Sequence, residues 1–476
     1  MAIVLLRRNE LTEGGVSLGR YVCDVTVIWW CRRDLRLGDN PALCAATEDG
    51  PVVPLVVVDP ALLHDGARPR EAWFAATVLA LDEQLGGGIV LRSGSPVDEV
   101  VAVARDVGAS AVHVSRETTP FGRRRDAAVR AALAEHGIDW IETGSPYAVT
   151  PGRVVKPDGS PYRVFSAFQR AWREHRWPRP ARLPSEIHWT APSGSSGADA
   201  REALHAAVRS CEVPLPAAGE KAALAVWERF RTDGLPRYAL DRDRPDLDGS
   251  SRLSPYLKVG AVHPRTLLDG LGSGEGAEKF ASELCWRDFY ADVLHHHPGS
   301  LTTDLTEVLA GLEYLAPGPE FEAWQRGETG YPLVDAGMRQ LLAEGWMHNR
   351  VRMVVASFLA KDLHVWWPHG AAHFQDLLID GDPASNAHGW QWVAGTGTDA
   401  APYFRVFNPT AQAEKFDPQG EYVRRYVPEL RHLSGAAALT PWKHTGGYDH
   451  GYPARIVDHA HERLVTLEHY RTARKS

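Results

Sequence analysis

Residues 389–409 (GWQWVAGTGTDAAPYFRVFNP) carry the clearest chemical signature in this chain of 476 residues. The segment combines two tryptophans, a Gly/Thr turn, an acid, three further aromatic residues and an arginine. Surface loops seldom contain so many aromatic residues, and core segments seldom contain so many glycines. We therefore expect a backbone pressed against a flat ring system, with aromatic side chains that stack on it or pass electrons to it.

A second group of chemical interest is the set of hydroxyls in residues 249–255 (GSSRLSP). They stand at a predicted helix start, where free backbone N–H groups favour a phosphate. The same pattern also fits an ordinary serine cap of a helix. The residues alone leave both interpretations open.

Two pairs of side chains lie four residues apart in segments with a helical pattern. Glu283 and Arg287 share one helix face, with Trp286 beside them. Asn349 and Met353 have the same spacing. Each pair also has a purely structural interpretation, as an exposed ion pair in the first case and a buried methionine in the second.

The elements that must position these groups begin with an α/β pattern. Apolar runs rich in β-branched residues indicate buried strands at 24–31, 52–58 and 111–115, with a weaker strand at 89–92. Helical patterns lie between them at 70–85, 97–107 and 122–136, and a further helix is capped by Asp39 or Asn40 with Pro41 in its first turn. This alternation predicts a Rossmann-like, doubly wound parallel sheet, whose ligands bind at the carboxyl ends of the strands.

The rest of the chain predicts a connector and a helical domain. Prolines, glycines and serines break the pattern over 147–218, although 165–173 is typical of a helix. From residue 219 onward the apolar spacing is helical throughout. We therefore predict an N-terminal extension over 1–23, an α/β domain over 24–146, the connector over 147–218, and an all-α domain over 219–476.

Composition limits the classes of function. The net charge of −8 argues against a nucleic-acid partner unless a local basic rim supplies the phosphate contacts. The arginines of the aromatic-rich segments are the candidates for such a rim: Arg287, Arg350, Arg352 and Arg405. Apolar runs stay shorter than the roughly 18 residues that span a bilayer, so we expect no membrane attachment.

Metal and disulfide chemistry are not expected either. The cysteines at 23, 31, 44, 211 and 285 lack metal-ligand spacing and are typical of reduced cytoplasmic thiols. Three consecutive histidines, 295–297, would point about 100° apart on a helix, so they would not converge on one ion.

Taken together, three segments resemble the DNA photolyase/cryptochrome family. They are 345–367 (GWMHNRVRMVVASFLAKDLHVWW), 380–386 (DGDPASN) and 389–409, and the match extends from about residue 25 to the C-terminus. The resemblance implies that the α/β domain holds an antenna chromophore and that the helical domain holds FAD. It also implies light-driven electron transfer to damaged DNA in place of acid, base or nucleophilic chemistry.

The family's cofactor positions map onto a set of residues in the helical domain. The resemblance places Ser250, Ser251 and Ser254 at the FAD pyrophosphate, Arg352 and Asp380 alongside the flavin ring, and Asn386 at flavin N5. Photolyases generally carry Asn there, plant cryptochromes Asp and insect-type cryptochromes Cys. The remaining implied cofactor contacts are Tyr238, Leu253, Trp286, Arg287, Asn349 and Asp382.

The family's substrate pocket and electron path also map onto this chain. Stacking on Trp286 and Trp392, hydrogen bonding to Glu283, and contact with Asn349 and Met353 would hold a flipped-out pyrimidine dimer. Trp390 and Trp367 match the first two members of the tryptophan chain that photoreduces the flavin. The third position carries Tyr314, a departure; we expect this exposed phenol to end the path, or Trp324 or Trp366 to end it while Tyr314 only packs.

The antenna type is indicated by Lys258 in SPYLKVGAV. It matches a lysine of deazaflavin-type members, and the segment after His297 lacks the Cys-Lys pair of a folate-type relative. We therefore expect 8-hydroxy-5-deazaflavin as the antenna, with Arg33, Arg70 and Glu117 as its neighbours. Methenyltetrahydrofolate is the alternative chromophore. Lys258 also has a purely structural interpretation, as a simple surface lysine.

The subfamily expected is a class I cyclobutane pyrimidine dimer photolyase, a cytoplasmic monomer that acts on UV-damaged DNA. A cryptochrome photoreceptor is the main alternative, and Asn386, the pocket residues and the short segment after 456–474 argue against it. A (6-4) photolyase would carry His where Asn349 stands. A plain flavin electron-transfer protein would not need the pocket.

Overall fold

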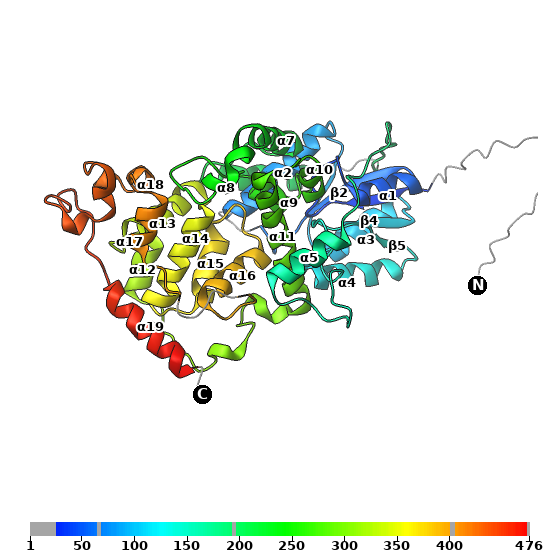
Figure 1. The fold of residues 1–476 in the computed structure, drawn as a ribbon. Coiled ribbons are helices and arrows are strands. Elements are labelled where there is room, and N and C mark those ends of the chain that lie inside the picture. Colours follow the sequence, from blue (N-terminus) through cyan, green and yellow to red (C-terminus); the bar gives the residue numbers. More distant parts are fainter. Residues whose placement is uncertain (1–24, 64–67, 193–196, 400–404, 474–476) are drawn as a thin grey trace, which may run out of the picture.

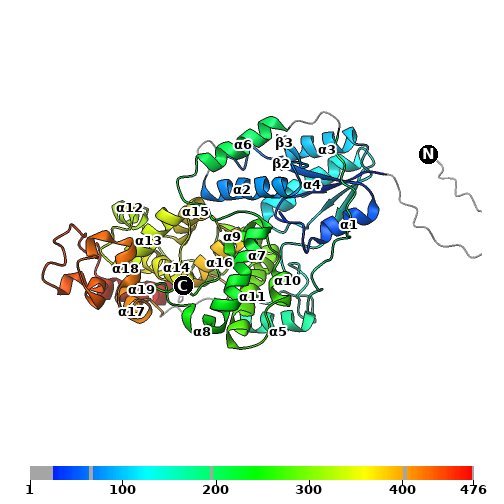
Figure 2. The same cartoon turned by 90° about the horizontal axis from the view of Figure 1, so that it is seen from above.

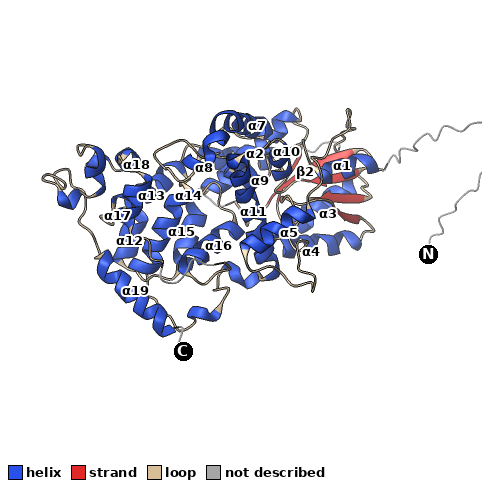
Figure 3. Ribbon diagram, viewed as in Figure 1, coloured by secondary structure: helices blue, strands red, loops and turns tan. Residues whose placement is uncertain are grey.

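The computed structural model describes residues 25–63, 68–192, 197–399 and 405–473. The expected N-terminal extension, Cys23 and two aromatic residues of the segment 389–409 lie outside these ranges. The fold is an α/β unit with a parallel sheet, followed by a helical unit (Figure 1). Strands occur at one end of the molecule (Figure 3).

The sheet has the strand order β3-β2-β1-β4-β5, and all neighbouring strands are parallel. Its strands are β1 (Val27–Trp30), β2 (Val52–Val58), β3 (Val90–Ser93), β4 (Ala111–Val114) and β5 (Asp139–Glu142). The β1 and β2 sequences, VIWW and VVPLVVV, are apolar throughout because helices bury both faces of the sheet. The edge strand β5 was not predicted, since DWIE is short, polar and partly exposed.

Helices cover both sides of this sheet, and each begins with a proline in its first turn. They are α1 (Pro41–Asp49), α2 (Pro69–Gln84), α3 (Pro96–Asp106) and α4 (Pro120–Ala134). The Asn40 side chain caps α1 by accepting a hydrogen bond from the Leu43 amide at 3.1 Å. The expected α/β alternation is therefore confirmed, with Asn40 as the cap.

The stretch expected to be a connector contains two helices. The predicted helix is present as α5 (Phe165–His175), whereas α6 (Ala198–Arg209) was missed. α6 packs against α2 and β3 and so extends one layer of the α/β unit (Figure 2). The Gly/Ser-rich run that precedes α6 in the sequence concealed its apolar spacing.

Every regular element described after β5 is helical. The longer helices that frame the site are α11 (Glu275–His296), α14 (Asn349–Ser357), α15 (Trp367–Leu377) and α16 (Pro383–Ala394). Helix α13 (Pro332–Glu344) packs against α14. The others are α7 (Glu220–Arg229), α8 (Tyr238–Asp241), α9 (Ser254–Val259), α10 (Pro264–Asp269), α12 (Pro319–Arg326), α17 (Pro409–Phe416), α18 (Glu421–Tyr426) and α19 (His459–Ala473). No helix among these described elements has the length and apolarity needed to cross a bilayer.

One hydrophobic core joins the α/β unit to the helical unit. It runs from Trp29 and Trp73 to Tyr256 and Leu284. The Trp73 indole N–H donates to the Pro255 carbonyl at 2.9 Å, and the Trp73 ring meets Tyr256 edge-on at 5.2 Å. These contacts fix α9 on α2, so the cavity described next rests on a shared core.

Candidate active site

A cavity of about 760 Å³ opens between α8, α9, α11, α14, α15 and α16. Fifteen of the predicted cofactor and substrate residues line it: Tyr238, Ser250, Ser251, Ser254, Glu283, Trp286, Arg287, Asn349, Arg352, Met353, Asp380, Asp382, Asn386, Trp390 and Trp392. Leu253 instead packs into the core with 1% of its surface exposed. The volume falls within the roughly 300–1,000 Å³ of small-molecule sites.

Three serine hydroxyls gather at one side of the cavity. Ser250 and Ser251 precede Arg252, whose φ of 53° turns the chain into α9 at Ser254. The Trp346 indole N–H donates to the Ser254 hydroxyl at 3.4 Å, and Arg252 lies 3.6 Å above the Trp346 ring. This end of the cavity therefore offers hydroxyls and a cation, which suit a phosphate.

A charge pair and an amide also line the cavity. Arg352 donates to both carboxylate oxygens of Asp380, at 2.9 and 3.1 Å, and the Asp380 side chain is only 3% exposed. The Asn386 side-chain N–H donates to the Ala371 carbonyl at 2.8 Å. This bond fixes the amide plane and leaves the Asn386 carbonyl oxygen without a partner in the described part of the chain, available to accept a bond from a ligand.

Asp382 ties the cavity to the α/β unit. One carboxylate oxygen caps α16 by accepting from the Ser385 amide at 3.1 Å, and the other pairs with Arg33 at 2.8 Å. Burial alone would raise the pKa of Asp382, but Arg33 and Lys258 hold it well below its usual range. Asp382 is thus a permanent anion that fixes the start of the helix carrying Asn386.

Three of the four predicted antenna residues converge at this junction. Arg33 pairs with Glu117 at 3.4 Å and donates to the Lys258 carbonyl at 3.4 Å. Burial, followed by the nearby charge of Arg33, lowers the pKa of Lys258 to about 8, and its side chain also lines the large cavity. Arg70 instead bonds to the Gln375 carbonyl and lies 3.8 Å from Asp376.

The structural alternative for Glu283 and Arg287, an exposed i, i+4 ion pair, is not formed. Glu283 pairs with Arg242 at 2.5 Å, and Arg242 also lies 5.5 Å from the Tyr238 ring centre. Arg287 donates to two backbone carbonyls, those of Pro146 and Leu257, at 2.7 and 3.0 Å. Glu283 is therefore oriented by a residue that the sequence pattern did not single out.

Two tryptophans, Trp286 and Trp392, line the cavity. Trp286 stacks on Phe165 with ring centres 3.6 Å apart and an interplanar angle of 6°. Trp392 and the half-buried Met353 line the same space, and Asn349 is exposed at the first turn of α14. Flat aromatic and apolar side chains of this kind suit contact with an aromatic or pyrimidine ring.

The rim is only partly basic. Arg350 pairs with Asp243 at 2.9 Å, while Arg352 and Arg287 are engaged as described above. Arg405 is exposed. Arg242, Arg252 and Lys279 add positive charge to the cavity wall, so the cations gather locally although the chain as a whole is acidic.

Aromatic contacts lead from the cavity toward α19. The Trp390 ring lies against Gly370, one turn along α15 from the fully buried Trp367. Trp367 meets Trp366 at 6.5 Å between ring centres, and Trp366 meets Tyr314 at 6.3 Å. Trp324 forms a side branch at 6.1 Å from Trp390, where its indole N–H donates to the Val355 carbonyl.

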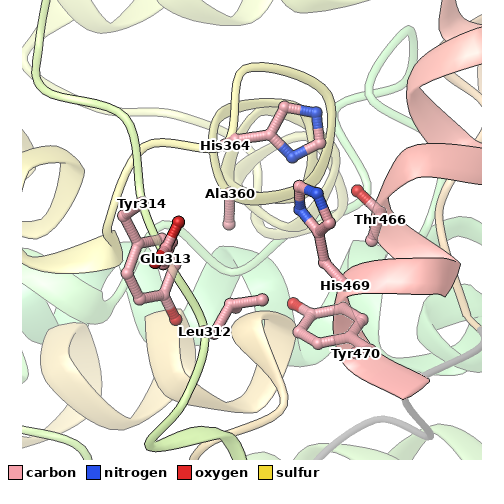
Figure 4. Close-up of a pocket in the computed structure, with 8 residues that line it drawn as sticks. All are labelled: Leu312, Glu313, Tyr314, Ala360, His364, Thr466, His469 and Tyr470. Carbon is pink, nitrogen blue, oxygen red and sulfur yellow. The ribbon is translucent and has the colours of Figure 1, made fainter. Parts of the chain in front are cut away.

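The expectation of an exposed Tyr314 phenol is wrong. Its hydroxyl is buried and has no hydrogen-bond partner within the described ranges, and burial raises the pKa of Tyr314. Figure 4 shows the ring beside a cavity of about 10 Å³ that is also lined by His364, His469 and Tyr470. A space of this size holds about one water molecule. α19, which supplies two of these residues, covers the phenol.

Sequence reasoning missed three residues that shape the site: Arg242, Phe165 and Trp346. Their partners are distant in sequence, so no spacing rule applies to them. For the histidine run, the described residues include no group of three or more His, Cys, Asp or Glu placed to hold a metal ion.

Comparison with known proteins gives consistent results. The chain matches the family model "DNA photolyase" over residues 27–186 and "FAD binding domain of DNA photolyase" over residues 280–472. It is 36% identical to the deoxyribodipyrimidine photo-lyase of Alkalihalophilus pseudofirmus, over 93% of this chain and 97% of that protein.

Two solved structures share the fold over almost their whole length. The class III photolyase of Agrobacterium tumefaciens has a TM-score of 0.82 at 34% identity, covering 97% of this chain and 100% of that one. The archaeal photolyase of Sulfolobus tokodaii, which contains two FAD molecules, has a TM-score of 0.83 at 30% identity, covering 94% and 100%.

Proposed function

This chain belongs to the DNA photolyase family, and on that premise we propose that it is a deoxyribodipyrimidine photo-lyase. Its activity is the light-driven repair of cyclobutane pyrimidine dimers in DNA. The observation that carries the proposal is the single cavity in which Asn386 and the Arg352–Asp380 pair share space with Glu283 and Trp286. The residues expected at the cofactor and those expected at the lesion line the same cavity, which supports the proposal.

The residues of the cavity fit FAD. The hydroxyls of Ser250, Ser251 and Ser254 suit its pyrophosphate, and the Arg352–Asp380 pair suits the polar edge of its ring system. The Asn386 amide oxygen, left without a partner within the described residues, suits a ring N–H. When bound and reduced, FAD supplies the electron that light transfers to the dimer and that returns after the cyclobutane ring opens.

The chain's own part in repair is to bind, orient and desolvate the lesion. The dimer must leave the duplex to reach the cavity, and its weakened base pairing lowers the free-energy cost of this flipping. We propose that Trp286 and Trp392 stack against the flipped bases and that Met353 excludes water between them. Glu283, held by Arg242 at 2.5 Å, accepts a hydrogen bond from a base edge, while phosphate contacts supply the sequence-independent binding.

A finer classification rests on fewer residues. We propose a class I enzyme whose electron path runs from Trp390 through Trp367 to Tyr314, acting as a cytoplasmic monomer. Asn386, together with Glu283, Trp286 and Met353 in the same cavity, supports repair over a cryptochrome-type signalling role.

The antenna proposal is 8-hydroxy-5-deazaflavin, next to Lys258, Arg33 and Glu117, with Arg70 at the edge of the group. The convergence of Arg33, Glu117 and Lys258 at the junction of the two units supports a chromophore site there. Methenyltetrahydrofolate is the alternative, and the two FAD molecules in the archaeal structure add a second flavin as an outcome to test.

The test of this function uses purified protein that has been loaded with FAD, with the FAD then reduced, and DNA that carries cyclobutane dimers. Repair should require light and should disappear in the dark. Light-independent loss of dimers, or no loss under light by protein that retains FAD, would contradict the proposal.

A further inference from the structure

A carboxylate meets the middle member of the aromatic path. The Trp367 indole N–H donates to an Asp304 carboxylate oxygen at 2.6 Å, while Trp367 itself is 0% exposed and Asp304 is half-buried. Hydrogen bonds to an ionised carboxylate are short and about twice as strong as neutral ones. Within the described residues, the indole N–H of Trp366 and the hydroxyl of Tyr314 have no partner, and Trp324 meets a neutral carbonyl.

The position of Asp304 is fixed from the helix that carries Trp390. The next residue, Leu305, donates its amide to the Gln391 side chain at 2.8 Å, and Gln391 in turn donates to the Ser300 carbonyl at 2.7 Å. The Thr306 amide donates to the Thr396 carbonyl at 3.0 Å. The hydrogen bonds of Ser300, Leu305 and Thr306 thus hold the loop of Asp304 against α16 and the residues that follow it. The Asp304 carboxylate is therefore preorganised with respect to Trp367.

We propose that Asp304 makes Trp367 an efficient electron donor, by stabilising the oxidised indole and accepting its proton. The oxidant is Trp390 in its one-electron-oxidised form, produced when light excites oxidised flavin in the cavity. One electron passes from Trp367 to Trp390, which becomes neutral again. The N–H bond of Trp367 breaks, its proton forms an O–H bond with Asp304, and a neutral indolyl radical and a carboxylic acid remain.

This assignment adds a residue to the proposed photoreduction path and therefore rests on the proposed function. Asp304 acts through Trp367 and touches neither cofactor nor dimer, so it is a positioning residue for electron transfer. The same carboxylate lies near the exit of the path: burial raises the pKa of Tyr314 and of Tyr470, and the negative charge of Asp304 adds to the rise in both. Positive charge formed anywhere near this exit is thus drawn toward Asp304.

The test is Asp304→Asn in the FAD-loaded, oxidised enzyme, followed by transient absorption after a blue flash. The amide keeps a hydrogen-bond acceptor but removes the charge and the proton acceptor. We expect the yield of long-lived radical to fall by about tenfold, the factor that separates a charge-assisted from a neutral hydrogen bond. At early times, before the oxidation passes on to Tyr314, we also expect the tryptophan radical of the variant to carry the spectrum of the protonated cation, whereas the parent shows the neutral tryptophan radical.

Glu307→Gln is the matched control, because Glu307 is an exposed acid three residues along the same loop. It should behave like the parent. Equal radical yield and spectrum in Asp304→Asn and the parent would overturn the inference, and so would an equal loss in both variants.

A second measurement uses the parent enzyme alone, in case Asp304→Asn does not retain FAD. Time-resolved infrared spectra after the flash should show the carbonyl band of a newly protonated carboxylic acid, rising together with the neutral radical. Absence of that band would overturn the inference. Dimer repair by chemically reduced parent enzyme is measured in the same preparations; its failure would refute the proposed function without bearing on Asp304.

Discussion

Replacing Arg33 by methionine should destabilise the protein, because Arg33 links two buried carboxylates across the junction of the two units. It pairs with Glu117 at 3.4 Å and with Asp382 at 2.8 Å, and the three side chains are 14%, 6% and 9% exposed. Methionine keeps the apolar stem and removes the charge. The variant therefore leaves two buried anions without their main partner, a change that typically costs about 3–5 kcal/mol.

The pKa of Glu117 gives an independent magnitude. Burial alone would raise it, but Arg33 and Arg125 lower it from 4.5 to about 2. At roughly 1.4 kcal/mol per pKa unit, this shift contributes about 3 kcal/mol to the free energy of unfolding at neutral pH. Because the folded-state pKa is depressed, the contribution is complete above about pH 4.5 and is lost as the pH falls toward 2.

Urea unfolding followed by circular dichroism measures this prediction at several pH values between 7 and 3. Arg116→Met is the matched control, because Arg116 is 43% exposed and lies 3.7 Å from Glu142, an arrangement worth at most about 1 kcal/mol. Arg33→Met should lose roughly 3 kcal/mol at pH 7, and the difference from the parent should shrink in acid. Equal losses in the two variants, or a difference that does not change with pH, would refute the reasoning.

Three further predictions concern the site. Glu283→Ala should lower the repair yield while FAD is retained, because it removes a hydrogen bond worth about 1–3 kcal/mol. Trp286→Ala should weaken binding of dimer-containing DNA by a similar free energy, because a stacking partner is lost. Unchanged repair and affinity in both variants would mean that the pocket is misplaced. Co-expression with deazaflavin synthesis should add an absorption band to the purified protein that is lost in Lys258→Ala, and co-purification of methenyltetrahydrofolate or a second FAD would contradict this antenna assignment. Tyr314→Phe should abolish the tyrosyl radical after a blue flash and slow photoreduction, whereas the parent's radical spectrum in the variant would exclude Tyr314 as the terminal donor.

Sequence patterns predicted the fold well for strands that are buried on both faces and for helices whose buried residues recur at a regular spacing. β1 and β2 are apolar along their whole length because both faces are covered, so they stand out in the sequence. β5 and α6 were missed because a short polar edge strand and a helix behind a Gly/Ser run carry little signal. Elements at the margin of a layer contribute few core residues, and their patterns are correspondingly weak.

In the candidate site, too, some residues could be predicted from the sequence and others could not. Residues inside the recognised segments, such as Asn386 and Trp390, converge in one cavity because short helices bring those segments together. Arg242 and Asp304 escaped notice because their partners, Glu283 and Trp367, lie 41 and 63 residues away. The burial of Tyr314 was not predicted either, since nothing in its own segment reveals that α19 covers it.

The central claim is that this chain repairs cyclobutane dimers with light, and one assay tests it most directly. Ultraviolet-irradiated oligothymidylate is mixed with the purified, reduced, FAD-loaded protein, and dimers are counted before and after blue or near-ultraviolet illumination. The account predicts loss of dimers under light, none in the dark, and a much smaller loss with Trp286→Ala at limiting DNA. Protein that retains reduced FAD and still leaves every dimer intact under light would contradict it.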